Sequence, residues 1–288
     1  MTLVVGRITQ GGIRIDSDSR ITDPKIVSNK NSVFSGLLKT IILNPSISVS
    51  YAGDVEIAQK AIEKLYNLEK FEINKIKSLL LKLNIESGNE TDFLIASLEN
   101  QPLLYKISNG KIEPSNSFHW IGDITAFNLF QKEFIPNIKN IEANHICSVH
   151  SDAFNKVIES DKIESVGGFH ITVHRTKFGL EYLFKMKIIS GQSTSMTLRN
   201  NEFKSIPFGN AQTGAFSYSY LKSNNPFLPA IGIHFPIGNF GTLYYPKISR
   251  EIIFYKDVNP FEFAKKVKNE YKIELSGMVK NGDLMTMI

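Results

Sequence analysis

The chain opens with TLVVGRITQGGIRIDSDSR at residues 2–20, and this stretch carries the strongest signal about the architecture. Residues 3–7 and residues 13–15 place apolar side chains at alternate positions, which is typical of β-strands. The segment Thr9-Gln10-Gly11-Gly12 between them is rich in residues that favour a tight turn. We therefore predict two strands joined by a turn at the start of the chain.

The next part of the sequence predicts a second pair of strands and then two helices. The strands are expected at 40–43 and 47–51, separated by the turn pair Asn44-Pro45. A long helix is expected after Gly53, with Asp54 as its N-cap, because apolar residues then recur at helical spacing. The same spacing through residues 73–83 predicts a second helix.

The remaining elements fit a mixed fold. Strands are predicted at Phe93–Leu98, Leu103–Ile107, Phe118–Ile121, Phe169–Val173 and Leu180–Ile189, and helices at about 123–135, 151–161 and 259–272. Runs of strands alternate with pairs of helices, which favours antiparallel sheets between helix layers. The predicted class is α+β. The segment 205–246 is aromatic, and Lys222 is its one formal charge. It is expected either to form an interface or gate element or to fold back as extra strands on its own domain.

Composition excludes several classes of protein. The chain has 288 residues, of which 42% are apolar and 21% charged, so wholesale disorder is excluded. The single cysteine, Cys147, permits no internal disulfide and no cysteine-based metal cluster. The net charge of +5 is scattered, and no nucleic-acid partner is expected. No signal peptide or membrane helix is recognisable, so we expect a cytoplasmic protein that does not bind membranes.

Thr2 is the first candidate catalytic residue. Methionine is normally removed before a small residue, and removal of Met1 would leave a free α-amine beside the Thr2 hydroxyl. An α-amine has a pKa of about 7.7–8.0, so it can act as the general base for its own hydroxyl. Threonine with its own terminal amine is a known activated nucleophile.

The residues around Thr2 strengthen this interpretation. They resemble the catalytic β-type subunits of the proteasome, which belong to the N-terminal-nucleophile hydrolases. The matching positions are Thr2, Gly12, Asp18-Ser19-Arg20, Lys39, Asn44-Pro45 and Ala52-Gly53. The resemblance covers about residues 2–190. It implies a four-layer αββα sandwich over residues 1–190, followed by a strand-rich extension with a final helix over 191–288.

The resemblance also implies a catalytic role for each matching residue. The Thr2 hydroxyl would attack an amide carbonyl, and Lys39 would lower the pKa of that hydroxyl. Asp18 would pair with Lys39 and orient it. The N–H of Gly53, near a helix N-terminus, would stabilise the oxyanion.

Two places depart from the family pattern. Active relatives carry a serine where the third helix begins, and here Asp123 stands between Gly122 and Ile124. They also carry an aspartate and a serine just before a Gly-Gly pair. Here Gly167-Gly168 is present, but the matching positions are Ile163 and Val166. The residues that could replace them are Asp123 itself, which could instead be a plain N-cap, and Asp161, Glu164 or Ser165.

The resemblance further implies a substrate pocket lined by Ile21, Ile41, Tyr51 and Val55. All four are apolar or aromatic, so cleavage after apolar residues is expected. The predicted function is a threonine peptidase that acts as a homo-oligomer on peptides or unfolded proteins, with no metal and no cofactor. Two alternatives stay open: an amidohydrolase acting on a small-molecule amide, and a catalytically silent scaffold or binding protein.

Other candidate chemistry is weaker. Asp16-Ser17-Asp18 has a faint likeness to a calcium-binding loop, but it lacks the glycine and the distal glutamate. His170 and His174 would lie about 13 Å apart on a strand, too far to share one ion. They are expected to be surface or sheet histidines. Cys147 and His150 have no local support as a thiol nucleophile and its base.

Overall fold

The computed structural model describes residues 2–10, 12–20, 36–138, 145–160, 162–190, 195–199, 202–207, 215–236, 238–281 and 284–288. Among them are five helices and several antiparallel sheets, so the fold is α+β. The described residues up to Glu181 form one compact unit, and those from Tyr182 onward form a second. Sequence analysis placed this boundary after residue 190. Ile21 and Asp161, two of the predicted candidates, lie outside the described residues.

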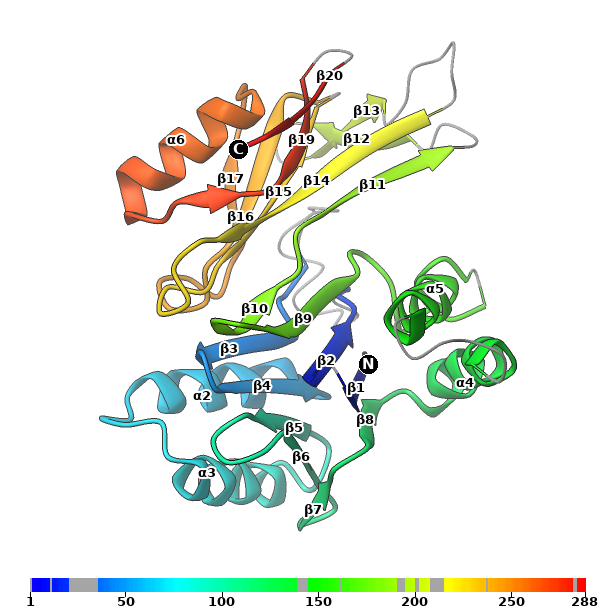
Figure 1. Cartoon of the computed structure of the whole chain (residues 1–288), viewed down its shortest axis with the longest axis vertical. Helices are drawn as coiled ribbons and strands as arrows, with labels where there is room; N and C mark the ends of the chain where they lie inside the picture. Colours follow the sequence, from blue (N-terminus) through cyan, green and yellow to red (C-terminus); the bar gives the residue numbers. More distant parts are fainter. Residues whose placement is uncertain are drawn as a thin grey trace. The chain divides into compact units, whose positions relative to one another are not determined.

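The first sheet of the first unit brings together strands from both ends of that unit (Figure 1). Its strand order is β10-β9-β2-β1-β8, and the pairs β1–β2, β1–β8 and β2–β9 are antiparallel. The strands are β1 (Leu3–Thr9), β2 (Gly12–Ser17), β8 (Phe118–Gly122), β9 (Ile171–Thr176) and β10 (Gly179–Tyr182). Strand β1 therefore lies inside the sheet, with the end of β8 beside its start.

The second sheet is a meander in which each strand pairs with the next along the chain. All of its neighbouring strands are antiparallel. The strands are β3 (Thr40–Asn44), β4 (Ile47–Ala52), β5 (Asp92–Ser97), β6 (Leu103–Ser108) and β7 (Lys111–Ser115).

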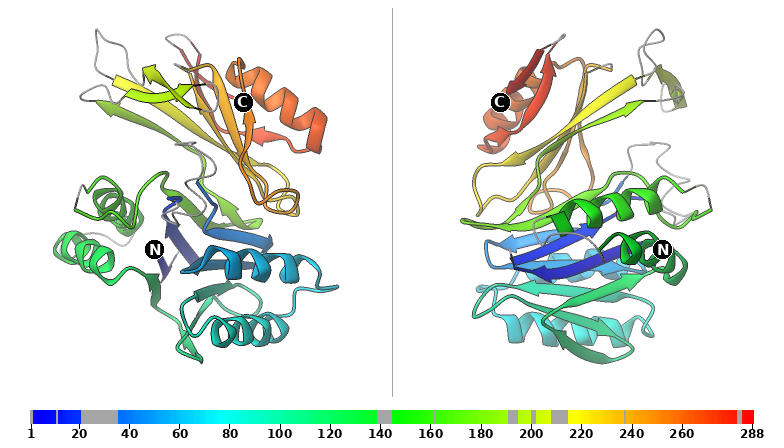
Figure 2. Two further views of the ribbon diagram at one scale, coloured as in Figure 1. Left: turned by 180° about the vertical axis from the view of Figure 1, so that it is seen from behind. Right: turned by 45° about the vertical axis from the view of Figure 1, so that its right-hand side comes forward.

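Strand β1 packs on both of its faces. Leu3 and Val5 share a buried core with helices α4 (Ile124–Ile138) and α5 (Ile146–Ile158). On the other face, a Cβ atom at Gly6 would lie 3.0 Å from Leu94 of β5. Helices α2 (Val55–Tyr66) and α3 (Ile73–Glu86) contact each other, and α3 contacts the second sheet. Figures 1 and 2 show the two helix pairs on separate sides of the unit.

Most predicted elements of this unit are present, and the differences have local causes. Asp54 caps α2 as predicted, because its side chain accepts a hydrogen bond from the Ile57 amide. Strand β7 was missed because it is an edge strand that contains Pro114 and polar residues. Helix α5 begins at Ile146, before the predicted 151, and the strand predicted at 180–189 is two strands, β10 and β11 (Lys185–Ser190).

The second unit is built on a six-stranded sheet. Strands β11, β14, β15, β16 and β17 are adjacent in that order, and β18 pairs with β14. The strands not yet located are β14 (Ala215–Ser223), β15 (Ile231–Phe235), β16 (Phe240–Tyr244), β17 (Ile253–Tyr255) and β18 (Leu275–Ser276). Two hairpins complete it, β12 (Ser195–Arg199) with β13 (Glu202–Pro207) and β19 (Met278–Asn281) with β20 (Leu284–Met287). The described part of 205–246 thus contributes strands, one of its two predicted roles.

Helix α6 (Pro260–Tyr271) lies in the same unit, close to the predicted range of 259–272. Asn259 and Glu262 form a capping box at its start, which a proline at the first turn complements. The fully buried ring of Phe263 packs where the sheet has glycines: a Cβ at Gly232 or Gly241 would lie 2.8 or 2.5 Å from it. The two glycines therefore permit the close approach of α6 to the sheet.

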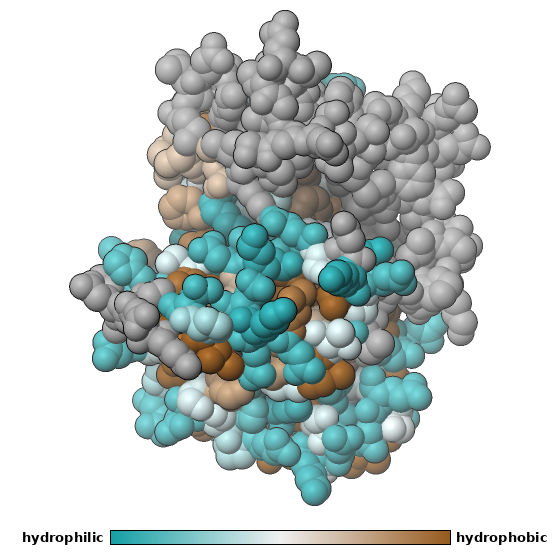
Figure 3. All heavy atoms as spheres, turned by 90° about the vertical axis from the view of Figure 1, so that its right-hand side faces the viewer, coloured by the Kyte–Doolittle hydropathy of each residue, from teal (hydrophilic) through white to brown (hydrophobic). Residues whose placement is uncertain are grey.

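The surface of the first unit on the side of α4 and α5 is mainly hydrophilic, and small hydrophobic patches are scattered over it (Figure 3). Ile124 and Ile135 of α4 are 55% and 44% exposed. No helix in the described part of the chain is both long and apolar enough to cross a membrane.

Candidate active site

Thr2 lies at the start of β1, where three strand ends meet. Its carbonyl oxygen accepts a hydrogen bond of 2.8 Å from the Asp123 amide. Gly122, the last residue of β8, has a φ of +106°, and a Cβ there would lie 1.9 Å from the same oxygen. It would also lie 3.3 Å from the Cβ of Ala52, the last residue of β4. Glycine is thus required at position 122 for β1, β4 and β8 to converge.

Asp18 is the main partner of the Thr2 side chain. It follows β2 and is fully buried, and its Oδ1 accepts hydrogen bonds from the Thr2 hydroxyl and, at 3.1 Å, from the Leu3 amide. Its Oδ2 accepts from the amides of Arg20 at 3.1 Å and Gly167 at 3.3 Å. The carboxylate is therefore held by donors on both oxygens. Sequence analysis paired Asp18 with Lys39 and did not foresee the direct bond to Thr2.

The charge state of Asp18 depends on its burial and on Lys39. Burial raises the pKa of Asp18 above its ordinary value, and the positive charge of Lys39 acts in the opposite direction, as do the hydrogen bonds from Thr2, Leu3 and Gly167. Lys39 precedes β3, is 3% exposed, and its Nζ lies 5.3 Å from the centre of the Tyr51 ring. The structure thus places the Thr2 hydroxyl on Asp18, and the charge of Lys39 acts on the same carboxylate.

Gly53 lies between β4 and the N-cap of α2, as predicted. Its φ is +124°, and a Cβ at this position would lie 2.0 Å from the Glu90 carbonyl oxygen. Because β4 ends beside Gly122 and Thr2, Gly53 follows directly on the strand end that borders the threonine. The N-terminal end of α2 adds a partial positive charge there, which favours a developing anion.

Asp123 is the N-cap of α4, and its second carboxylate oxygen also has a partner. Its Oδ1 caps α4 by accepting hydrogen bonds from the amides of Thr125 at 2.7 Å and Ala126 at 3.0 Å. Its Oδ2 accepts a hydrogen bond of 2.6 Å from the Ser165 hydroxyl. The pKa of Asp123 is lowered: burial opposes the shift, but the hydrogen bonds from Ser165 and the two amides outweigh it.

Among the described candidates for the missing polar residues, Ser165 is the one that bonds to Asp123. Ile163 and Val166, at the positions that match the family pattern, are buried in the core beneath α4 and α5. Glu164 is exposed to solvent. In this pair, Asp123 supplies the carboxylate between β8 and α4, and Ser165 supplies the hydroxyl near Gly167-Gly168. The family pattern described above has a serine at the first place and an aspartate before the glycine pair.

The predicted pocket residues are almost completely buried. Ile41 and Tyr51 are each 1% exposed and Val55 is 5% exposed. Ile41 pairs with Val49 across β3 and β4, and the ring of Tyr51 faces the Lys39 ammonium group. Tyr51 therefore covers the lysine whose charge acts on Asp18.

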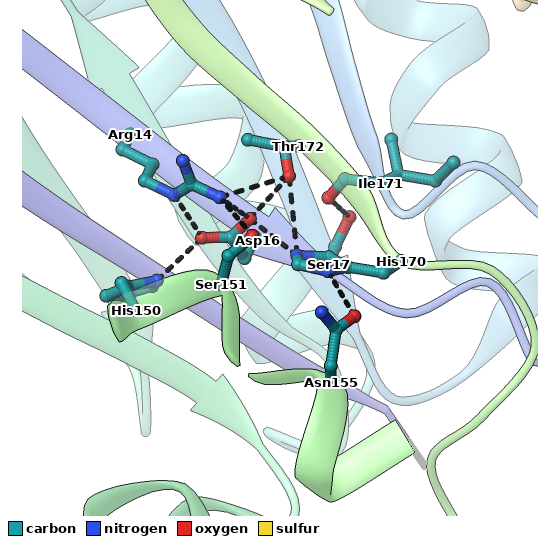
Figure 4. Close-up of polar contacts among 9 residues, drawn as sticks. All are labelled: Arg14, Asp16, Ser17, His150, Ser151, Asn155, His170, Ile171 and Thr172. Carbon is teal, nitrogen blue, oxygen red and sulfur yellow. Dashed lines mark hydrogen bonds and ion pairs between the residues drawn. The ribbon is translucent and has the colours of Figure 1, made fainter. Parts of the chain in front are cut away.

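Sequence reasoning missed a buried polar cluster around Asp16 (Figure 4). The Asp16 carboxylate contacts Arg14, His150, His170 and Thr172, each at 2.6 Å at its shortest distance. His170 is 2% exposed and directly precedes β9, so it is not a surface histidine, whereas His174 lies within β9, one of the two expected placements. The alternation of Arg14 and Asp16 with Ile13 and Ile15 was the available signal, since it places both charged side chains on one face of β2.

The cluster is not arranged as a metal site. Within the described ranges, no group of three or more histidine, cysteine, aspartate or glutamate side chains could hold a metal ion. The faint likeness of residues 16–18 to a calcium loop has another explanation: Asp16 and Asp18 belong to two separate hydrogen-bond networks.

Neither the protein-family models nor the curated proteins with which the chain was compared give a match. The chemistry of the site therefore rests on its own residues and their geometry.

Proposed function

We propose that the chain is an N-terminal-nucleophile hydrolase of the proteasome β-subunit type, acting as a threonine peptidase. The observation that carries the proposal is the contact of buried Thr2 with buried Asp18 at the start of β1. The Thr2 hydroxyl donates to Asp18, and the charge of Lys39 acts on the same carboxylate. A threonine at position 2, held beside a buried acid and a buried lysine, has the groups that an N-terminal nucleophile needs.

The arrangement of the first unit supports the same assignment. One sheet packs against α4 and α5, the other sheet contacts α3, and Gly6 of β1 faces leucines of the second sheet. We interpret this as the four-layer αββα sandwich that the family uses. We also propose that the protein is cytoplasmic and assembles as a homo-oligomer.

The proposed reaction begins after Met1 is removed. The freed Thr2 amine takes the hydroxyl proton, and Thr2 Oγ bonds to the carbonyl carbon of the scissile amide. The carbonyl electrons move onto oxygen, where the Gly53 N–H stabilises the negative charge. When the intermediate collapses, the C–N bond breaks and the amine leaves with the proton. Water then hydrolyses the Thr2 ester, releasing the acid and restoring the hydroxyl.

The neighbouring residues tune this chemistry. The positive charge of Lys39 favours the alkoxide that develops at Thr2. Asp18, fixed by three backbone amides, orients the hydroxyl and balances the charge of the lysine. The Asp123 amide donates to the Thr2 carbonyl oxygen, so the hydrogen-bonded pair of Asp123 and Ser165 lies next to Thr2. We propose that it takes the place of the polar residues absent at positions 163 and 166.

Covalent labelling tests the proposal. The purified protein is exposed to a β-lactone that acylates N-terminal threonine, and its intact mass is recorded. We expect loss of Met1 and one adduct on Thr2, with the adduct nearly absent in Lys39→Ala. Lys82→Ala is the matched control, because that side chain is 74% exposed on α3. Retained Met1, or a free Thr2 that never reacts, would favour the silent scaffold instead.

A second experiment separates the two possible substrates. Fluorogenic peptides with an apolar residue before the cleaved bond are compared with small acyl amides, and the mass of the assembly is measured by light scattering. Cleavage of peptides by a closed ring supports the peptidase. Turnover of small amides alone by an open dimer supports the amidohydrolase.

A further inference from the structure

Burying the charged groups around Asp16 costs free energy, which calls for an explanation. Asp16 is fully buried, and burial disfavours its charge, yet its pKa lies well below the usual range because Arg14 and His170 stabilise the carboxylate. Arg14 donates twice to it, from Nε at 2.6 Å and from Nη2 at 2.9 Å. Well-packed apolar side chains often stabilise a fold as well as a buried ion pair does. The cluster is therefore better explained by what it positions.

The cluster joins three elements at one point. Asp16 lies on β2, His150 lies on α5, and His170 directly precedes β9 (Figure 4). One ring nitrogen of His170 contacts Asp16 at 2.6 Å, and the other contacts Asn155 of α5 at 2.9 Å. His170 thus ties the start of β9 to both β2 and α5.

The segment 165–170 leads from the cluster to the candidate active site. Ser165 donates to Asp123, and the Gly167 amide donates to Asp18. The Gly167 carbonyl accepts from the amides of Ser19 at 3.2 Å and Arg20 at 3.1 Å. The hydrogen bonds of Asp18 and those of Asp123 therefore both include atoms of segment 165–170.

Strand pairing does not extend over this segment. The register of β2 with β9 begins at Ser17 opposite Ile171, one residue after His170. Directly before the paired residues, the side chain of His170 makes the contacts to β2 and α5, in place of strand pairing. The Phe169 amide also donates to the Ser19 hydroxyl at 2.8 Å, so displacement of His170 would loosen the C-terminal end of residues 165–169 without freeing it.

We infer that His170 is a positioning residue of the proposed active site, which through Asp16 and Asn155 holds segment 165–170 against Asp18 and Asp123. The inference rests on the proposed function. It adds a residue other than Thr2, Asp18 and Lys39, one that touches none of the reacting atoms.

The test measures acylation of Thr2 by the β-lactone in His170→Ala, His170→Gln and the wild-type protein. We expect His170→Ala to lower the maximal acylation rate by about 100-fold with little change in lactone affinity, since small displacements of catalytic groups have effects of this size. His170→Gln keeps an N–H donor toward Asp16 and should recover most of the rate. His145→Ala, at an exposed position before α5, is the matched control.

The pH profile of acylation distinguishes positioning from loss of fold. The Gly167 N–H lowers the pKa of Asp18, so its displacement should raise that pKa and shift the acidic limb of the profile to higher pH in His170→Ala. A variant that merely unfolds in part would lose amplitude at every pH without a shift.

Hydrogen exchange gives a readout that does not depend on activity. In His170→Ala, the amides of Ser19, Arg20 and Gly167 should exchange at least about tenfold faster, while those of β5 and β6 stay protected. Unchanged exchange, or wild-type acylation rates in His170→Ala, would overturn the inference. If the wild-type protein itself is not acylated, the proposed function fails, and the exchange data still decide whether His170 holds the segment.

Discussion

A double-mutant cycle on Asp123 and Ser165 gives the sharpest test of the polar network beside Thr2. Asp123→Ala removes an N-cap, worth about 1 kcal/mol, and a hydrogen bond from Ser165 to a charged acceptor, worth about 1.5 kcal/mol. We therefore expect it to lower the free energy of unfolding by about 2.5 kcal/mol and Ser165→Ala to lower it by about 1.5 kcal/mol. Because the bond is lost only once, the double variant should also lose about 2.5 kcal/mol, a coupling of about 1.5 kcal/mol.

Trp120 provides the signal for this cycle. It is the single tryptophan of the chain, and its ring stacks on Phe127 of α4 at 4.2 Å between centroids. Its fluorescence during urea titration at pH 7 therefore reports the unfolding of the first unit near α4, the helix that Asp123 caps. Strictly additive effects, about 4 kcal/mol in the double variant, would refute the reasoning, because they would mean that the two side chains do not share a bond.

Three further predictions concern other parts of the chain. Gly122→Ala should destabilise the first unit by more than about 2 kcal/mol, measured by urea unfolding, because its new Cβ meets backbone, whereas Gly88→Ala, with no atom within 4 Å, should lose only about 1 kcal/mol. Burial lowers the pKa of His150, so the folded state disfavours its protonation and stability should fall as pH drops below about 6.5; in His150→Gln the melting temperature should change less between pH 7.5 and about 5.5. Gly241→Ala should lower the thermal stability of the second unit, and less so in a Phe263→Leu background, where the ring that it would strike is absent.

The elements that could be predicted are those whose signal is local. Alternation of apolar residues identified β1 and β2, and an acidic N-cap followed by an apolar stripe identified α2. The failures occurred where local signals are weak or misleading. The single long strand predicted at 180–189 hid a break between two strands, because its sequence stays apolar across the break.

The residues of the candidate site also differ in whether a local sequence pattern could identify them. Thr2, Asp18, Lys39 and Gly53 could be proposed because their order and spacing within one continuous part of the chain resemble the proteasome β-type pattern. The pairs Ser165–Asp123 and His170–Asp16 are separated by 42 and 154 residues, and no local pattern links their members. Tertiary packing brings them together, since α5 and β9 lie beside β2 and α5 packs on α4, which follows Asp123. The sequence reasoning therefore dismissed His170 and left Ser165 as one of several candidates.

The register of β1 is what places Thr2 on Asp18. Val4 pairs with Ser17, so the residues that follow outward on the two strands, Leu3 and Asp18, stand opposite each other, and Thr2 reaches the same carboxylate. A slip by one residue would exchange the two faces of β1. Gly6 opposes such a slip, because the side chains of Leu94 and Leu104 in the second sheet lie 3.0 and 3.3 Å from where its Cβ would be, and they would have to shift to admit a larger residue there. The position of the proposed nucleophile therefore depends on a glycine that takes no part in the chemistry.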